Sequence, residues 1–366
     1  MEFVNLSNVC DVYSGYAFKK FNDNKEGMPV IKIGNIKTDG SINKMSCSYT
    51  DETPLEKFFS QKDDLYIALS GATTGKVGIM DESGYLINQR VGVIRRKDMN
   101  IPINYIKFFL DSITEKILKD AVGAAQPNIS PRDILKYKFP LKTYNEMSII
   151  SNVLTKINGD IKKCKNYIAN LDNIVKSQFI EMFGKLENTE YPIDTLNNIC
   201  EFIKDGTHQT PTYTEDEDGY IFVSSKDVTS GKIDWDNTKR IPKELHEQLY
   251  SRIAPKKNDI LLSKNGTIGF AVLVEEDRIF DIYVSLAILR QNKLNPVFMK
   301  EQLNAEDCQK QFYSSLKGVG VPNLHLGEIK KTKVIVPPIE LQNKFADFVQ
   351  LIDKSKYFGG VCYGIC

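Results

Sequence analysis

A glycine-rich segment near residue 71 is the first place where the sequence could bind a phosphate. It reads Gly71-Ala-Thr-Thr-Gly75-Lys76. In a nucleotide-binding P-loop, four residues separate the two glycines, and a serine or threonine follows the lysine to bind the metal ion. Here three residues separate the glycines and Val77 follows the lysine. The spacing argues against a nucleotide site and favours a turn at the end of a strand, either close to DNA or purely structural.

A second segment resembles a catalytic motif. Asn295-Pro-Val-Phe298 is similar to the Asn-Pro-Pro-Tyr motif of adenine methyltransferases, but valine replaces the second proline. No glycine-rich cofactor motif follows a strand in the context that cofactor binding would require. We therefore do not expect this chain to transfer methyl groups itself.

The histidines and cysteines do not form a metal-binding pattern. His246 and His325 lie far apart, without an E-x-x-H motif or neighbouring cysteines. The seven cysteines are scattered and include no C-x-x-C pair, which is typical of reduced thiols in a cytoplasm. The sequence predicts no metal site, no cofactor and no catalytic residue.

Two polar loops carry side chains that suit nucleic acid. The loop Asp205-Gly-Thr-His-Gln-Thr-Pro211 offers donors and acceptors for base edges or phosphates. The loop Ser14-Gly-Tyr-Ala-Phe-Lys19-Lys20 places an aromatic ring beside two lysines, which suits contact with the DNA backbone. The structural alternatives are that Asp205 and Thr207 cap a turn, and that Tyr16 and Phe18 are core anchors.

Composition limits what must position these loops. The 366 residues are 42% hydrophobic, which suits two domains of about 150 residues each. The net charge of +1 counts mildly against a nucleic-acid protein unless the cations cluster on one face. The cluster Lys330, Lys331 and Lys333 is most simply a solvated face. No signal-peptide pattern and no apolar run long enough to span a bilayer are present, so we expect a cytoplasmic chain without membrane contact.

The sequence contains an internal repeat. Leu6-Ser-Asn-Val-Cys recurs as Leu196-Asn-Asn-Ile-Cys, and Asp64-Leu-Tyr-Ile recurs as Asp259-Ile-Leu-Leu. The offset is 190 or 191 at the start and 195 from Asp64 onward. So long a period indicates duplicated domains and not a solenoid. In the Pro-Asn segments that also recur, we expect Gln126, Asn128 and Asn323 to secure a junction between domain and helix, with DNA contact as the alternative.

Each repeat has the pattern of an α+β domain. Strand-like runs at 65–69, 86–94, 260–262 and 282–289 alternate with turns. A helical pattern follows at 104–119, with a counterpart near 297–316. We expect the loops at one rim to hold the binding residues.

A long helix should connect the repeats. From Glu146 to Phe183 there is no proline, and apolar residues recur every three or four positions from Met147 to Met182, with Gln178 as the polar interruption. This spacing predicts a coiled-coil seam that ends at Gly184. A shorter helix carrying Phe345 should pair with it in antiparallel orientation and lie near the Met182 end. The apolar stripe between Met147 and Ile157 would then lack a partner within the chain, and we hypothesise that another subunit or a second copy covers it.

The chain resembles the specificity subunit of bacterial type I restriction-modification systems over residues 6 to about 356. The resemblance rests on the 205–211 loop, on Lys257-Asn-Asp-Ile-Leu-Leu-Ser-Lys-Asn-Gly-Thr-Ile-Gly269 and on Val336-Pro-Pro-Ile-Glu-Leu-Gln342. The first repeat departs more, with Ala72-Thr-Thr-Gly75 in the loop and Pro140-Leu-Lys-Thr-Tyr-Asn-Glu146 at the helix entry. The largest departure is the shortened last helix.

The resemblance implies two target-recognition domains, at 1–143 and 185–337, joined by antiparallel coiled-coil helices at 144–184 and 338–357, with an irregular tail at 358–366. It implies a subunit without catalytic activity that reads a bipartite site in double-stranded DNA, one half per domain, while the helices set the spacing. The partners would be methyltransferase subunits, with the restriction subunit bound through them. The DNA contacts that we predict are made by Ser14, Tyr16, Lys19, Lys20, Ser70, Thr73, Thr74, Lys76, Thr207, His208, Gln209, Thr210, Ser263, Lys264, Asn265 and Thr267.

Two other functions compete with this one. The duplicated domains could bind proteins in a coiled-coil scaffold or assembly protein. A stand-alone modification enzyme is disfavoured, because the two repeats and the helices occupy the whole chain.

Overall fold

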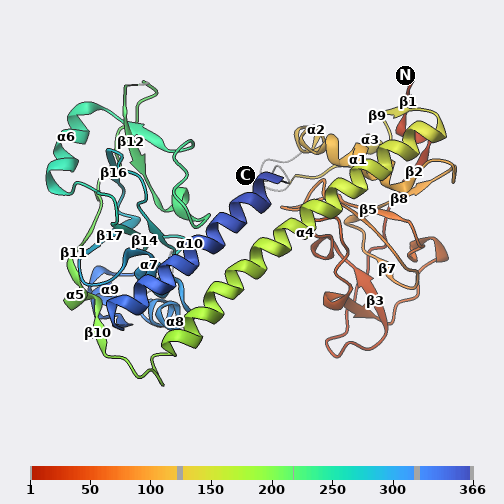
Figure 1. Ribbon diagram of the computed structural model, residues 1–366. Coiled ribbons are helices and arrows are strands. Elements are labelled where there is room, and N and C mark those ends of the chain that lie inside the picture. Colours follow the sequence, from red (N-terminus) through yellow and green to blue (C-terminus); the bar gives the residue numbers. More distant parts are fainter. Residues whose placement is uncertain (1, 122–126, 217, 317–321, 363–366) are drawn as a thin grey trace. The chain divides into compact units, whose positions relative to one another are not determined.

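The chain divides into two compact units, residues 1–162 (unit 1) and 163–366 (unit 2). The computed structural model describes residues 2–121, 127–216, 218–316 and 322–362, with the side chains of 358–362 left out (Figure 1). The boundary falls inside the long helix α4 (Tyr144–Phe183), which therefore contributes to both units.

Unit 1 is an α+β domain. Its strands are β1 (Glu2–Asn5), β2 (Cys10–Ser14), β3 (Met28–Ile31), β4 (Ser48–Thr50), β5 (Leu65–Ala68), β6 (Val77–Ile79), β7 (Leu86–Ile87), β8 (Val91–Arg96) and β9 (Lys138–Leu141). Its helices before α4 are α1 (Ile103–Ser112), α2 (Thr114–Asp120) and α3 (Pro131–Ile134).

Unit 2 repeats this arrangement with one added helix. Its strands are β10 (Ile193–Thr195), β11 (Cys200–Asp205), β12 (Tyr220–Val223), β13 (Lys239–Ile241), β14 (Ile260–Ser263), β15 (Ala271–Leu273), β16 (Phe280–Ile282), β17 (Leu286–Gln291) and β18 (Lys333–Ile335). Its helices are α5 (Leu196–Ile199), α6 (Lys243–Arg252), α7 (Pro296–Asn304), α8 (Glu306–Ser314), α9 (Leu326–Lys331) and α10 (Ile339–Cys362).

The sheets of the two units have the same topology. The four-stranded sheets run β2-β8-β5-β6 and β11-β17-β14-β15, and the three-stranded sheets run β4-β3-β7 and β13-β12-β16. In each unit the three-stranded sheet contains one parallel pair, β3 with β7 and β12 with β16. The two-stranded sheets β1-β9 and β10-β18 complete the match. The matched strand orders agree with a duplicated domain.

The change of offset in the sequence repeat corresponds to helix α6. Between β4 and β5 the chain of unit 1 makes only a short 3-10 turn at Glu56–Phe58, whereas unit 2 places the ten-residue α6 between β13 and β14. The longer connection of unit 2 therefore folds as a helix where unit 1 has only this short turn.

Two of the predicted strands are each divided in two. Residues 86–94 form β7 and β8, and residues 282–289 lie in β16 and β17, with a sharp turn between the strands of each pair. Each turn moves the chain from the three-stranded to the four-stranded sheet. The strands before and after each turn are both mostly buried. In unit 2 the mostly apolar sequence of 282–289 hides the turn, whereas in unit 1 the polar Asn88, Gln89 and Arg90 occupy it.

Each four-stranded sheet is covered by helices on one face. In unit 1, Leu65 and Ile67 of β5 pack with Ile106 and Leu110 of α1 in the main core. In unit 2 the equivalent core includes Phe298 and Leu303 of α7. The alternate residues of the same strands, such as Tyr66 and Leu261, face a second core that is shared with the three-stranded sheet.

Helix α4 is anchored at each end in a different way. At its start, Met147 is 3% exposed and belongs to the main core of unit 1. The expectation that Met147 lacks a partner is therefore wrong, although Ile157 is 47% exposed. At its end, Phe179 and Phe183 are the buried residues. The apolar stripe thus passes through Phe179 and not through Gln178, because a straight helix of 3.6 residues per turn drifts from a strict heptad.

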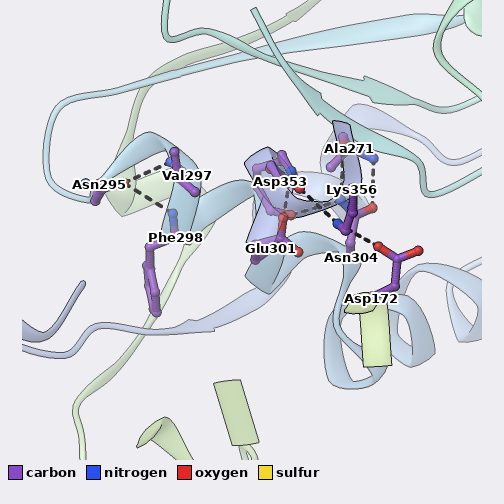
Figure 2. A network of polar contacts seen from close by, with 10 residues as sticks. Asp172, Ala271, Asn295, Val297, Phe298, Glu301, Asn304, Asp353 and Lys356 are labelled. Atoms are coloured by element: carbon purple, nitrogen blue, oxygen red, sulfur yellow. Dashed lines mark hydrogen bonds and ion pairs between the residues drawn. The ribbon is translucent and has the colours of Figure 1, made fainter. Parts of the chain in front are cut away.

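Within unit 2, helix α10 runs antiparallel to the last turns of α4. Phe345 lies against Phe179 and Phe183, with ring centroids 5.5 and 5.6 Å apart. Farther along α10, Lys356 forms ion pairs with Asp172 of α4 at 2.7 Å and with Asp353 at 2.9 Å (Figure 2).

The expected irregular tail is partly helical. Helix α10 continues to Cys362 and so includes two of its glycines. Glycine costs only about 1 kcal/mol per helical position, so an established helix can extend through it. Residues 363–366 lie outside the described residues.

Candidate functional site

Four segments of unit 1 meet where β2, β5 and β7 end: residues 14–20, 69–76, 88–90 and 127–131 (loop face 1). The backbone N–H of Tyr16 donates to the carbonyl of Ile87 at 2.7 Å, and that of Leu69 donates to the carbonyl of Arg90 at 2.9 Å. The N–H of Ile129 donates to the carbonyl of Leu69 at 2.9 Å. The strands therefore hold the backbone of these segments rigidly, while several side chains remain free to bind.

Unit 2 builds the same arrangement from residues 205–210, 263–269, 283–285 and 322–325 (loop face 2). The N–H of Thr207 donates to the carbonyl of Ile282 at 3.2 Å, and that of Lys264 donates to the carbonyl of Ser285 at 2.8 Å. The N–H of Leu324 donates to the carbonyl of Lys264 at 2.8 Å. Each backbone contact has its counterpart in loop face 1.

A glycine at the same place in each face makes this assembly possible. A Cβ atom at Gly15 would overlap the carbonyl oxygens of Ile87 and Asn88, and one at Gly206 would overlap the carbonyl oxygen of Ile282. Only glycine lets the first loop approach the turn between the two sheets so closely.

The predicted contact residues of unit 1 have different surroundings. Ser14 and Ser70 line a polar depression, and the Ser70 hydroxyl is buried without a partner among the described residues. The Thr73 hydroxyl is likewise buried without such a partner. Lys19 and Lys20 are exposed, and their backbone N–H groups both donate to Glu52 at 2.8 Å.

The remaining three predicted residues of unit 1 have structural contacts. The ring of Tyr16 packs edge-on against Phe18, with centroids 5.0 Å apart, as in the core-anchor alternative. The Thr74 side chain is 4% exposed, and its hydroxyl donates to the carbonyl of Pro127 at 3.0 Å. The Lys76 ammonium donates to the Thr38 hydroxyl at 3.1 Å. The Thr74 side chain therefore holds two loops together.

In unit 2, the segment after β11 is the accessible part of loop face 2. Three predicted residues there are exposed: His208, Gln209 and Thr210. The His208 ring lies 3.2 Å from the carboxylate of Asp205. Thr207 is half-buried, and its hydroxyl accepts from the N–H of Gln209 at 3.3 Å, as in the turn-capping alternative.

Two predicted residues at the end of β14 and directly after it are buried. Ser263 is 0% exposed, and its hydroxyl accepts from the N–H of Phe270 at 2.9 Å. Lys264 is 4% exposed, and its ammonium is paired with Asp205 at 3.2 Å. Both side chains are therefore buried and engaged within the unit, at positions where the repeat has the apolar Ala68 and Leu69 in unit 1. Thr267 is exposed, and Asn265 has a buried side-chain oxygen without a partner among the described residues.

Sequence reasoning missed residues in the turns between the sheets. Gln89 and Arg90 are exposed and line the polar depression of loop face 1, in a segment that the sequence pattern assigned to a strand. Asn128 also lines this depression and pairs with Ser70 in an isolated β-bridge. Asn323 pairs with Asn265 in the same way. The two asparagines therefore lie at the loop faces and not at a junction with a helix.

Gln126, for which we made the same prediction, lies outside the described residues. Arg252, at the end of α6, was also missed. Its guanidinium donates to the carbonyls of Asp205 and Gly206 at 2.8 and 2.9 Å, so it holds the start of the 205–210 loop.

Helix α6 is itself fastened by a buried polar pair. His246 Nδ1 lies 2.7 Å from Asp281 Oδ2 of β16, and the His246 ring stacks on Tyr220 at 3.7 Å. Burial raises the pKa of Asp281 to about 6, although the hydrogen bond from His246 partly opposes this rise. Since His246 holds α6, and α6 carries Arg252, this pair supports the loop indirectly.

The motifs that suggested chemistry have structural roles. Asn295 is the N-cap of α7, and its side-chain oxygen accepts from the N–H groups of Val297 and Phe298 at 2.9 and 3.3 Å (Figure 2). Burial raises the pKa of the Cys10 and Cys308 thiols to about 12, which makes them poor nucleophiles. Among the described residues, no cluster of histidine, cysteine and acidic side chains could hold a metal ion.

The family profile for type I restriction modification DNA specificity domains matches residues 1–173 and again residues 188–357. The chain belongs to this family. The resemblance seen in the sequence is thereby confirmed, with one specificity domain in each half. Each match includes the globular part of a unit and most of the helix that follows it, so the family unit is a domain together with its helix. In the described parts of the chain, no helix is both long and apolar enough to cross a bilayer.

The proteins similar to this chain include two specificity subunits and two solved structures. The EcoBI specificity subunit of Escherichia coli is 23% identical over 95% of this chain and 78% of its own length. The MjaVIII specificity subunit of Methanocaldococcus jannaschii is 29% identical over 46% of this chain and 44% of its own length.

Among the structures, the type I S subunit from M. genitalium has a TM-score of 0.55 at 18% identity and covers 99% of this chain and 92% of its own. A chain from a study of type I complex assembly has a TM-score of 0.53 at 14% identity, with 99% and 93% covered. At such identities the structures support the fold only.

Proposed function

We propose that this chain is the DNA-reading subunit of a type I restriction-modification complex, in which each specificity domain reads one half of a bipartite site in double-stranded DNA. The observation that carries the proposal is the pair of loop faces. Each has its backbone fixed by the same hydrogen bonds at the same strand ends, and each exposes polar side chains with base-reading chemistry. A rigid backbone with free polar side chains is what direct readout requires.

The two faces carry different side chains, so the two half-sites should differ in sequence. Loop face 1 exposes Gln89 and Arg90, where loop face 2 has the half-buried Val284 and the buried Ser285. Loop face 2 exposes His208 and Gln209, where loop face 1 has Ala17 and Phe18. Two similar frames with different side chains suit an asymmetric target.

We assign the spacing of the half-sites to α4. This helix has 40 residues and enters both units, and at 1.5 Å per residue it is about 60 Å long. The helices also offer surface to partners. Several apolar side chains of α4 are 44–64% exposed, among them Ile149, Val153, Ile157 and Ile180. We assign to them the docking of methyltransferase subunits, through which a restriction subunit would join, or self-association.

The chain itself would not be a catalyst in this function. Methyl transfer to a base requires the base to be flipped into an enzyme pocket, which is the task of the methyltransferase partner. The contribution of this chain would be to decide where on the DNA that partner acts.

The proposal is tested by mapping methylation. The full chain is co-produced with type I methyltransferase subunits from the same host, and the methylated sequence is determined across genomic DNA. Replacing 207–210 with the corresponding residues of a specificity subunit that recognises another sequence should change one half of the site and leave the other half and the spacing intact. Methylation without sequence preference would instead favour a coiled-coil scaffold, and a change in both halves would contradict one domain per half-site.

A further inference from the structure

The polar depression of loop face 1 lies where the ends of β2 and β5 meet the turn between β7 and β8. It is lined by Ser14, Ser70, Gln89, Arg90, Asn128 and Ser130, together with apolar atoms of Leu69, Ile129 and Pro131. The lining side chains offer both donors and acceptors, and the hollow is open to solvent. A surface of this kind can receive the edge of a base.

Arg90 is held rigidly at its backbone. Its N–H donates to the side-chain oxygen of Asn88 at 3.2 Å, and its carbonyl accepts from the N–H of Leu69 at 2.9 Å. The next N–H, of Val91, donates to the carbonyl of Asn88 at 2.9 Å. The position from which the Arg90 side chain departs is thus fixed by contacts on both sides.

The guanidinium of Arg90, by contrast, has no acidic partner among the described residues. The neighbouring arginines on β8 are engaged, since Arg95 pairs with Asp64 at 2.6 Å and Arg96 pairs with Asp63 at 3.2 Å. An arginine that is fixed at its backbone and unpaired at its tip has its donors available for a ligand.

The second unit does not repeat this feature. At the position that corresponds to Arg90 it has Ser285, which is 7% exposed and whose hydroxyl accepts from the N–H of Ser225 at 2.9 Å. The lysine of loop face 2, Lys264, is buried and neutralised by Asp205. An available cation in such a hollow is therefore particular to loop face 1.

We propose that Arg90 is a specificity-determining residue that reads a guanine in the half-site of unit 1. The fork of N–H donors on arginine matches the O6 and N7 acceptors of guanine in the major groove. It fits the other three bases less well. This inference rests on the proposed function, because it needs DNA at loop face 1.

The test compares Arg90→Ala and Arg90→Lys with the parent chain in the complex with methyltransferase subunits, by sequencing the methylated sites. Arg278→Ala, an exposed arginine in unit 2 that is paired with Glu276, is the matched control. We expect Arg90→Ala to lower discrimination at one G·C position, in the half not assigned to the 207–210 loop, by about ten- to hundred-fold. Arg90→Lys should retain part of it, and Arg278→Ala should leave the sequence unchanged.

Three results would overturn the inference. They are an unchanged sequence, a change in the other half, or a uniform fall in methylation with the sequence retained. The last result would identify a phosphate contact, because phosphate contacts weaken binding to all sequences alike. If the parent complex has a bipartite sequence and the loop exchange alters one half, the proposed function stands even when Arg90→Ala fails. If the parent has no sequence preference, the proposed function fails first.

Discussion

A buried ion pair occurs at the same place in both units, and its removal should destabilise each loop face. In unit 1 the Arg95 guanidinium donates to both oxygens of Asp64, at 2.6 and 2.9 Å, and to the carbonyl of Phe59 at 2.8 Å. In unit 2, Arg290 makes the same contacts with Asp259, at 2.8 and 2.6 Å, and with Ala254 at 2.7 Å. The pair ties the start of β5 or β14, which carries the central loop of each face, to the neighbouring strand.

The perturbation is Arg95→Leu. Asp64 is 2% exposed, and without the arginine its carboxylate keeps only the backbone N–H of Gln61, at 2.8 Å, among the hydrogen bonds described here. Removing one partner of a buried pair costs about 3–5 kcal/mol. Because the Arg95 side chain is 20% exposed, water can enter the vacated space, so we expect the lower end, about 3 kcal/mol. Replacing both partners, in Asp64→Leu/Arg95→Leu, should restore most of the loss, since no unpaired charge remains.

The assay is urea unfolding of the full chain, with hydrogen exchange of β5 and β14 to locate the effect. Arg290→Leu is the matched variant in unit 2. Trp235 is the one tryptophan of the chain and packs on Phe280 in unit 2, with ring centroids 5.2 Å apart. Its fluorescence should therefore follow the unit 2 variant. A loss below about 1 kcal/mol for Arg95→Leu, or a double variant as unstable as the single one, would refute the reasoning.

Three further predictions concern unit 2. Burial raises the pKa of Asp281 from 3.8 to about 6, so the folded state holds a proton that the unfolded chain has lost. The free energy of unfolding should therefore fall as pH rises from about 4 to about 6. Asp281→Asn should flatten this dependence in urea titrations, and an unaltered slope would count against it. Gly206→Ala places a Cβ atom against a backbone carbonyl and should abolish reading of one half-site in methylation mapping, whereas Gly327→Ala, with open space around it, should have no effect. Phe345→Ala, at a 0% exposed position, should lower the free energy of unfolding by about 3–5 kcal/mol in thermal or urea unfolding. The control is Leu351→Ala on the same helix, where leucine is 62% exposed. Equal losses of stability in the two variants would be inconsistent with this difference in burial.

The repeat and the long helix were predictable because their signals are local in the sequence. Asp64 and Asp259 begin matched segments, and the structure gives those segments the same strands with the same partners. The helix from Tyr144 to Phe183 follows from an apolar periodicity with one polar interruption, at Gln178. Its end at Gly184, where φ is +74°, follows from glycine. These features depend on residues that are near one another in the chain.

The errors fall where residues distant in sequence decide the outcome. The pattern could not show that Lys264 is buried against Asp205, because a lysine in a polar loop is ordinarily solvated. It also did not place Arg90 in a turn, because the strand-like pattern predicts one strand over 86–94, although the polar Asn88, Gln89 and Arg90 lie between β7 and β8.

The sequence by itself therefore determined the duplication, the α+β class, the connecting helix and the family, since each is written in spacing and in motif. Only the tertiary structure decided which loop side chains are free to bind. A side chain is unavailable to DNA where another residue of the chain already binds it, as Asp205 binds Lys264, Asp64 binds Arg95 and Ser225 binds Ser285. Burial and pairing are properties of the folded arrangement, and a polar residue has the same type in the sequence whether its hydrogen bonds are already satisfied or still available to DNA.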